Sequence, residues 1–230
     1  MNPILSVMKI HLKDRWTWFL IPWLFVLMSS FLINLLVGHI INDPEGFVTG
    51  GLSSIFVFML IAGGIIVTQT FPFAIGMCVR RTDYFLGTVA TISAFSALSA
   101  ALLSLLSWIE ELTEGWGTNM SYFYLPFLED LGWVGLPLFF FILLLNAFFT
   151  SFTIASLHKR FGRKGIFTLT IVFLLMSSIV SYLFLYFEWW DEIFNWIVDL
   201  SLKDVTVWLF PLTALYMLLS YWLLRRSMES

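Results

Sequence analysis

Apolar residues fill six long runs of the chain, and shorter polar segments separate them. The runs cover residues 16–41, 52–75, 85–108, 131–157, 165–187 and 205–224. Each has about the 20 residues that a helix needs to cross roughly 30 Å of hydrocarbon. The runs lack the alternating pattern of membrane barrel strands, and a helix satisfies its backbone polar groups internally. The pattern predicts an all-α membrane protein with six transmembrane helices, as a single domain over residues 1–230.

Composition excludes an ordinary soluble domain. Hydrophobic residues make up 60% of the chain and charged residues only 12%, whereas about a quarter of a soluble domain is charged. The first apolar run is too long for a signal-peptide core, so we expect it to be retained. Cys78 is the only cysteine, which excludes an intramolecular disulfide.

The polar segments alternate in charge along the chain. Eleven of the twelve basic residues precede the first run or follow the second, fourth and sixth runs: Lys9, Lys13, Arg15, Arg80, Arg81, Lys159, Arg160, Arg163, Lys164, Arg225 and Arg226. The other three connections hold twelve of the fifteen acidic residues: Asp43, Glu45, Glu110, Glu111, Glu114, Glu129, Asp130, Glu188, Asp191, Glu192, Asp199 and Asp204. Because cytoplasmic loops carry the Lys/Arg excess, both termini are expected in the cytoplasm of a multi-pass cell-membrane protein.

The first 15 residues predict a short amphipathic helix, with Asn2 as N-cap and Pro3 at its first position. Its expected apolar face holds Ile4, Leu5, Met8 and Leu12, and its polar face holds Ser6, Lys9 and Lys13. Such a helix would lie on the inner membrane surface, where Lys9, Lys13 and Arg15 attract anionic lipid. Contact with a partner is the alternative role.

The connection after the second run contains Pro72. This proline is expected to turn Phe71 away from helical geometry and to break or kink the second span. A short helix is predicted over residues 73–79, ended by Arg80 and Arg81 because positive charge is favourable at a helix C-terminus.

Thr82 or Asp83 is expected to cap the third span. Two interpretations of this connection remain open. It is either a tight basic turn that obeys the positive-inside rule, or a coupling helix that docks on a motor protein.

The connection between the fifth and sixth runs predicts an amphipathic helix at the outer membrane interface. One face collects Trp189, Trp190, Ile193, Phe194, Trp196, Ile197 and Leu200, and the other collects Glu188, Asp191, Glu192, Asn195 and Asp199. Interfacial anchoring by tryptophan is the ordinary role of such a helix, and a lid over a transport pathway is the alternative.

The third run carries a face of small residues: Ala90, Ala94, Ala97 and Ala101 beside Ser93, Ser96 and Ser104. We interpret this face as the place where a neighbouring helix packs closely.

The sequence lacks the common motifs for catalysis and for phosphate binding. It has no phosphate-binding glycine loop, no G-x-S-x-G elbow and no H-E-x-x-H pair. Glu110 and Glu111 are interpreted as a solvated helix end, and no confident acid or base lies inside a span, which argues against a proton-driven carrier. We therefore expect a non-catalytic protein without metal or cofactor, and nothing indicates nucleic acid as a partner.

Together these parts resemble the permease subunits of type-2 ABC exporters. The resemblance covers the whole chain, and its most specific part runs from Phe71-Pro72-Phe73-Ala74 to Arg80-Arg81-Thr82-Asp83-Tyr84-Phe85-Leu86-Gly87-Thr88, which is similar to the coupling loop of small Gram-positive permeases. It implies a bacterial plasma-membrane transporter with two permease chains, identical or related, and two cytoplasmic ATPase subunits that hydrolyse ATP.

In that assembly the expected coupling residues are Phe71, Pro72, Arg80, Arg81, Asp83 and Tyr84. The cargo would be hydrophobic or amphipathic, such as a peptide, drug or lipid. A different class remains open: a membrane-embedded binding or immunity protein without a motor. A small channel is less favoured because no span shows a continuous polar stripe.

Overall fold

The computed structural model describes residues 3–13, 16–41 and 46–225, and most of these residues are helical. The α-helices are α1 (Pro3–Lys13), α2 (Ser29–Ile41), α3 (Ser53–Ile65), α4 (Phe71–Gly76), α5 (Arg81–Leu112), α6 (Gly132–Tyr186), α7 (Trp190–Asp199) and α8 (Leu202–Arg225). Two π-helical stretches, Trp16–Met28 and Ile66–Thr70, lead into α2 and α4, and a 3-10 turn, Pro126–Leu131, precedes α6. Asn2, Arg15, Asp43, Glu45 and Arg226 lie outside the described residues.

Five helices of the described chain are long and apolar enough to cross a membrane: Leu20–Ile41, Ser53–Gly76, Arg81–Leu112, Gly132–Tyr186 and Leu202–Arg225. The 55-residue α6 contains Gly162 with φ 67° and ψ −171°, so two helices meet there at a bend. Four of the expected runs match single helices, and the bend in α6 falls between the fourth and fifth runs. The fold is that of an all-α membrane protein, and the six-span topology remains a prediction.

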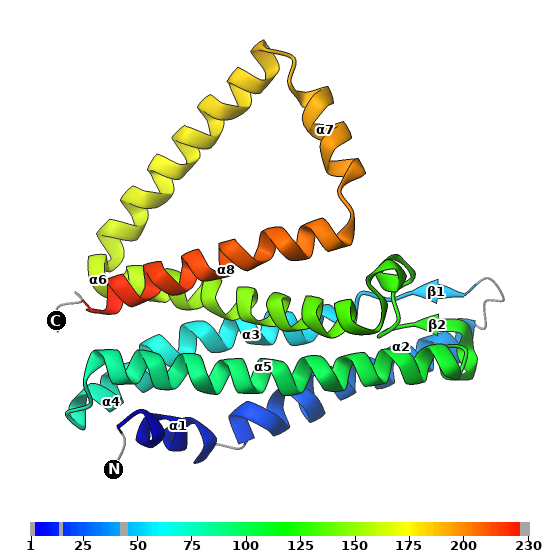
Figure 1. The fold of residues 1–230 in the computed structure, drawn as a ribbon, viewed down its shortest axis with the longest axis horizontal. Coiled ribbons are helices and arrows are strands. Elements are labelled where there is room, and N and C mark those ends of the chain that lie inside the picture. The colour runs from blue at the N-terminus through cyan, green and yellow to red at the C-terminus, as the bar shows by residue number, and fades with distance from the viewer. Residues whose placement is uncertain (1–2, 14–15, 42–45, 226–230) are drawn as a thin grey trace.

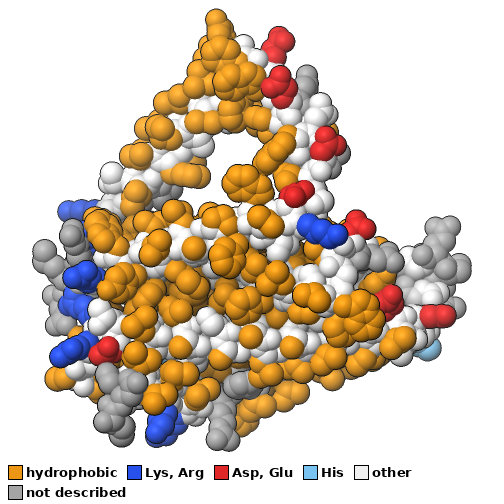
Figure 2. All heavy atoms as spheres, viewed as in Figure 1, with side chains coloured by type: hydrophobic (Ala, Val, Ile, Leu, Met, Phe, Trp, Pro, Cys, Tyr) orange, Lys and Arg blue, Asp and Glu red, His pale blue; other side chains and the backbone are white. Residues whose placement is uncertain are grey.

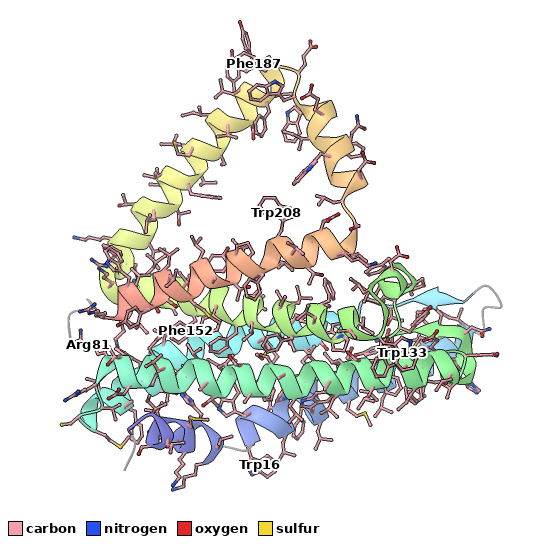
Figure 3. The ribbon with its side chains drawn as sticks, viewed as in Figure 1. Trp16, Arg81, Trp133, Phe152, Phe187 and Trp208 are labelled. Carbon is pink, nitrogen blue, oxygen red and sulfur yellow. The ribbon has the colours of Figure 1, made fainter. Side chains whose placement is uncertain are left out.

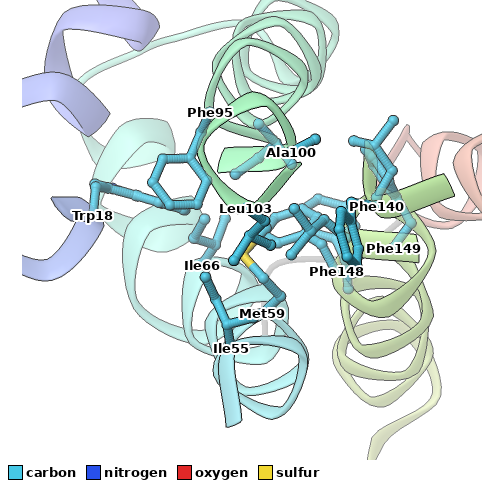
Figure 4. Packing of buried hydrophobic residues seen from close by; sticks show 14 of the residues in the cluster. Trp18, Ile55, Met59, Ile66, Phe95, Ala100, Leu103, Phe140, Phe148 and Phe149 are labelled. Atoms are coloured by element: carbon cyan, nitrogen blue, oxygen red, sulfur yellow. The ribbon is translucent and has the colours of Figure 1, made fainter. Parts of the chain in front are cut away.

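The core forms where α3, α5 and the first part of α6 pack together. Figure 4 shows Ile55 and Met59 of α3 and Leu103 of α5 against the phenylalanines of α6. Gly63 permits this approach, because a Cβ there would lie 2.3 Å from the Phe148 carbonyl oxygen. Small residues at such crossings let helix backbones come close enough for dense van der Waals packing.

Beyond Gly162 the chain leaves this core. The α6 arm (residues 163–186), α7 and α8 form three sides of a triangle (Figure 1). The arm's side chains are exposed, for example Phe173 at 71%. Helix α8 returns along the first part of α6, where Asn146 Nδ2 donates to Thr213 Oγ1 at 3.2 Å and Thr153 Oγ1 donates to the Tyr216 carbonyl at 3.1 Å.

Charges separate toward two ends of the molecule. Figure 2 shows most Lys and Arg side chains at the end where α1, α4 and the α6 bend lie, which we call the basic end. The acidic end lies opposite, at the C-terminus of α5, and carries Glu110, Glu111 and Glu114. Further acidic side chains follow α7.

Phe71 does not turn away from helical geometry and the second span does not break before Pro72, so this part of the predicted break or kink was wrong. Phe71 has helical angles, φ −63° and ψ −49°, and the helix continues from Ser53 to Gly76. The π-helical stretch explains the difference, because its wider turn relieves the clash that a proline ring makes with the preceding turn. Thr68 Oγ1 donates to the Gly64 carbonyl at 3.0 Å within the same region.

The interpretation of Glu110 as a solvated residue was also wrong. Its side chain is 1% exposed, and its carboxylate accepts backbone N–H groups of Tyr122, Phe123 and Tyr124 at 2.5, 2.9 and 3.2 Å. The indole N–H of Trp116 donates to the same carboxylate at 2.9 Å. Glu111 is exposed, as expected.

A short pair of parallel strands also lies at the acidic end. Strand β1 (Phe47–Val48) pairs with β2 (Met120–Ser121), which joins the connection after α2 to the connection after α5. These strands were not predicted, because two-residue strands leave no periodic pattern in the sequence.

The predicted packing face of small residues on α5 is only partly buried. Ala94, Ala97 and Ala101 are exposed, whereas Ser96 and Ser104 are buried. The helix therefore packs through the serine side of the predicted face.

Candidate functional site

The candidate site is the basic end, where the predicted coupling residues lie. Phe71 and Tyr84 are 3% and 0% exposed, and their rings meet edge to face with centroids 5.2 Å apart. Tyr84 donates its hydroxyl to the Ile66 carbonyl at 3.2 Å. Lys159 Nζ lies 5.4 Å from the Phe71 ring centroid, on the α6 side. These two aromatic residues therefore attach α4 to the core and are not themselves on the surface.

The surface of α4 and its following turn is apolar. Phe73 is 58% exposed and Met77 is 47% exposed, and Pro72 and Cys78 are exposed as well. Cys78 has φ 58°, so the turn that ends α4 is tight. The short helix thus occupies residues 71–76 and not 73–79 as predicted.

Arg80 and Arg81 lie at the start of α5 and do not end α4, contrary to expectation. Arg80 is the extended N-cap residue of α5, with φ −65° and ψ 139°, and α5 begins at Arg81. Thr82 and Asp83 consequently lie inside the first turn and are not the cap. The Asp83 carboxylate is favourable there, near the positive end of the helix dipole.

Basic side chains lie near α4 at this end of the molecule. Arg81 Nη1 donates to the Arg225 carbonyl at 3.4 Å, which connects the start of α5 to the end of α8. Figure 3 shows Arg81 at this end of the molecule and Trp133 at the opposite end. Arg80 is exposed, so it is available to a partner.

Helix α1 packs against α5 beside this site. A Cβ at Gly87 would lie 2.7 Å from Val7, so the two helices touch at that glycine. His11 Nε2 and Thr88 Oγ1 are hydrogen-bonded at 3.2 Å. Burial lowers the pKa of His11 from 6.5 to about 4, because desolvation disfavours the charged imidazole.

The buried face of α1 differs from the predicted apolar face. Val7 and His11 are buried, whereas Leu5 and Leu12 are 52% and 48% exposed. Lys9 and Lys13 are exposed as predicted, and Arg15 lies outside the described residues.

The amphipathic helix before the last span is present as α7. Trp189, which precedes α7, is 46% exposed, and Trp190 and Trp196 are 45% and 56% exposed; Ile193 is half-buried. The tryptophans therefore offer a broad aromatic surface, as expected. The structure places this surface far from the coupling residues, so the two predicted sites are separate (Figure 1).

The contacts of three residues with other elements were not predicted from the sequence: those of His11, Glu110 and Arg160. Val7 and His11 are four residues apart, which would place them on one helix face. Glu110 lies beside the end of an apolar run, where burial could have been suspected. Arg160 gave no separate signal within its basic segment.

The basic end thus combines an exposed apolar helix, a surrounding set of cations and a rigid attachment to the core. The arrangement presents apolar side chains to the surface with exposed basic side chains beside them. Comparisons of the chain with family models, curated proteins and solved structures gave no match.

Proposed function

We propose that the chain is the membrane-spanning permease subunit of an ATP-driven exporter, and that α4 docks on a separate cytoplasmic ATPase. The observation that carries the proposal is the exposed apolar surface of α4, which Phe71 and Tyr84 attach rigidly to the core. A partner that moves α4 would therefore move α3 and α5 with it.

Burial of Phe73 and Met77 would supply the apolar centre of the interface, and Arg80 would supply charge at its rim. Partly exposed aromatic side chains that become fully desolvated commonly dominate binding energy. In this proposal the basic end faces the cytoplasm, both termini lie inside, and ATP hydrolysis takes place in the partner. Two permease chains, identical or related, would form the pathway for a hydrophobic or amphipathic cargo.

The test compares two phenylalanines with equal exposure. Phe73 at the basic end and Phe127 at the acidic end are each 58% exposed. The chain is co-expressed with candidate ATPases, purified in mild detergent, and its partners are identified by mass spectrometry. We expect F73D to lose a stoichiometric ATPase and F127D to retain it; equal recovery by both variants would contradict docking through α4.

Charge reversal gives a second test of the same surface. R80E is expected to weaken ATPase binding, and R80E/R81E is expected to uncouple transport from hydrolysis with normal membrane insertion. The single variant is the cleaner one, because Arg81 also donates to the Arg225 carbonyl. Unchanged transport in the double variant would exclude a coupling role for these arginines.

A second candidate function is a motor-free binding or immunity protein. The observation that favours it is a hollow of about 430 Å³ at the acidic end, lined in part by Glu110, Glu111 and Glu114. Together with the aromatic surface of α7, it would suit a basic amphipathic peptide. Repeated purification of the chain alone, with all candidate ATPases expressed, would favour this function.

A further inference from the structure

A second hollow lies at the corner where α6 bends toward its arm. It has a volume of about 470 Å³. Apolar side chains dominate its lining, and they come from both α6 and α8: Leu157, Phe161, Leu169, Leu219, Trp222 and Leu223. Figure 2 shows that the space between the arm, α7 and α8 is open, with apolar side chains around it. Contact of these apolar side chains with water is unfavourable, so an apolar occupant of the hollow is favoured.

The guanidinium group of Arg160 lies against two of the rings that line this hollow. Its Cζ lies 4.1 Å from the ring centroid of Trp222 and 5.0 Å from that of Phe161, and both rings line the hollow. Its Nη1 atom is buried, yet no described group accepts a hydrogen bond from it. A buried donor without an acceptor costs free energy, and more so when it is charged. An anionic oxygen from a ligand would remove that cost.

The surrounding charge also favours an anion. Arg163 and Lys164 follow on the next turn of the chain and are exposed. Asp83 is the one acidic residue among the described residues of the basic end. The ligand therefore needs a negative group at one end and an apolar chain beside it, which is the structure of a phospholipid.

We propose that this hollow binds the acyl chain of an anionic phospholipid whose phosphate accepts hydrogen bonds from Arg160. The planar guanidinium presents paired donors that match phosphate oxygens. The rings of Trp222 and Phe161 hold the guanidinium at the boundary between headgroup and acyl chain. The site is distinct from the α4 surface, and the proposal does not depend on an ATPase partner.

The experiment uses the full chain in lipid nanodiscs with a phosphatidylglycerol that carries a photoreactive acyl chain. After irradiation, labelled peptides are identified by mass spectrometry. We expect labelling in residues 157–169 of α6 and 219–223 of α8. Unlabelled phosphatidylglycerol should compete, glycerol phosphate should not, and a photoreactive diacylglycerol should label about tenfold less, as loss of one charged hydrogen-bonding partner implies.

Three variants separate the roles of charge and space. R160Q is expected to reduce labelling about tenfold, because the phosphate loses its charged donor. T168W is expected to abolish it by filling the hollow while Arg160 stays in place. K203Q removes an exposed cation at the opposite end of α8 and should leave labelling unchanged. A monodisperse elution profile of each variant checks its folding.

Several results would overturn the proposal. Equal labelling by the diacylglycerol, or by R160Q, would exclude the phosphate contact. Competition by glycerol phosphate would mean that the site binds a free anion. Labelling that persists in T168W would place the lipid elsewhere, and a lipid-free dimer that protects these peptides would show that a second copy of the chain fills the hollow.

Discussion

At the acidic end, the carboxylate of Glu110 receives four N–H groups from a loop that is otherwise short of regular structure. Residues 114–119 include Glu114, Trp116 and Asn119 at positive φ, a geometry that costs free energy for residues other than glycine. The hydrogen bonds to Glu110 offset this cost. One side chain thus connects Trp116 to the backbone of residues 122–124.

E110Q is expected to destabilise the folded protein by about 3 kcal/mol, because an amide offers one acceptor oxygen where the carboxylate offers two. Thermal unfolding in detergent and chymotryptic cleavage of residues 115–124 would measure the effect. E111Q is the matched control, since Glu111 is exposed. Equal stability of the two variants would show that the loop does not depend on the buried carboxylate.

We expect the docking of α1 to depend on pH through His11. Its pKa is lowered to about 4 in the folded protein, so its contribution is fully present above pH 6.5 and is lost as pH falls toward 4. The difference corresponds to about 3 kcal/mol. Protease accessibility of α1 should rise across this range in the native chain, and H11Q should remove the part of the change that belongs to His11. The same pH response in both proteins would assign it to other groups.

At the scale of elements, two irregular positions determine how the helices run. The π-helical stretch before Pro72 keeps α3 and α4 continuous, so that α4 extends rigidly beyond the core. Gly162 has the opposite effect, because it turns α6 away from the bundle and creates the hollow beside Arg160. Each irregularity lies next to one of the two proposed binding surfaces.

G162A tests the bend without a change in packing. A Cβ at Gly162 would meet nothing within 4 Å, so the cost of about 1–3 kcal/mol arises from the backbone angles alone. Thermal unfolding measures this cost, and the distance between spin labels on either side of the bend reports any straightening. G76A is the control, because its Cβ also meets nothing and its φ is not in the left-handed region; its effect should stay within about 1 kcal/mol. Equal effects of G162A and G76A would contradict a glycine-dependent bend.

At the scale of the whole molecule, exposed residues at the basic end and at the acidic end allow the orientation of the chain in the membrane to be tested. Cys78 is exposed at the basic end. A membrane-impermeant maleimide is expected to label it in inside-out vesicles and not in right-side-out vesicles. In a C78S background, F127C at the acidic end should show the reverse pattern. Labelling of Cys78 from outside would invert the proposed topology.

Much of the fold followed from local pattern. The length of each apolar run predicted where the helices lie, and the segregated faces of residues 188–204 predicted α7, because both signals depend only on neighbouring residues. The basic segment around Pro72 was also predicted, as the connection between the second and third apolar runs. Its internal detail was not, since the course of the chain at Pro72 and the place of Arg80 depend on how α3 and α5 pack.

Sequence pattern thus accounts for the membrane-compatible helices, the separation of charge and the aromatic surface of α7, because hydrophobicity and charge act along the chain itself. The tertiary structure alone decided which residues meet: Val7 with Gly87, Glu110 with the loop at Tyr122, and Arg160 with Trp222. Those contacts join positions far apart in sequence, and their geometry depends on the packing of whole helices. For that reason the buried face of α1 and the hollow beside Arg160 could not be predicted from periodicity.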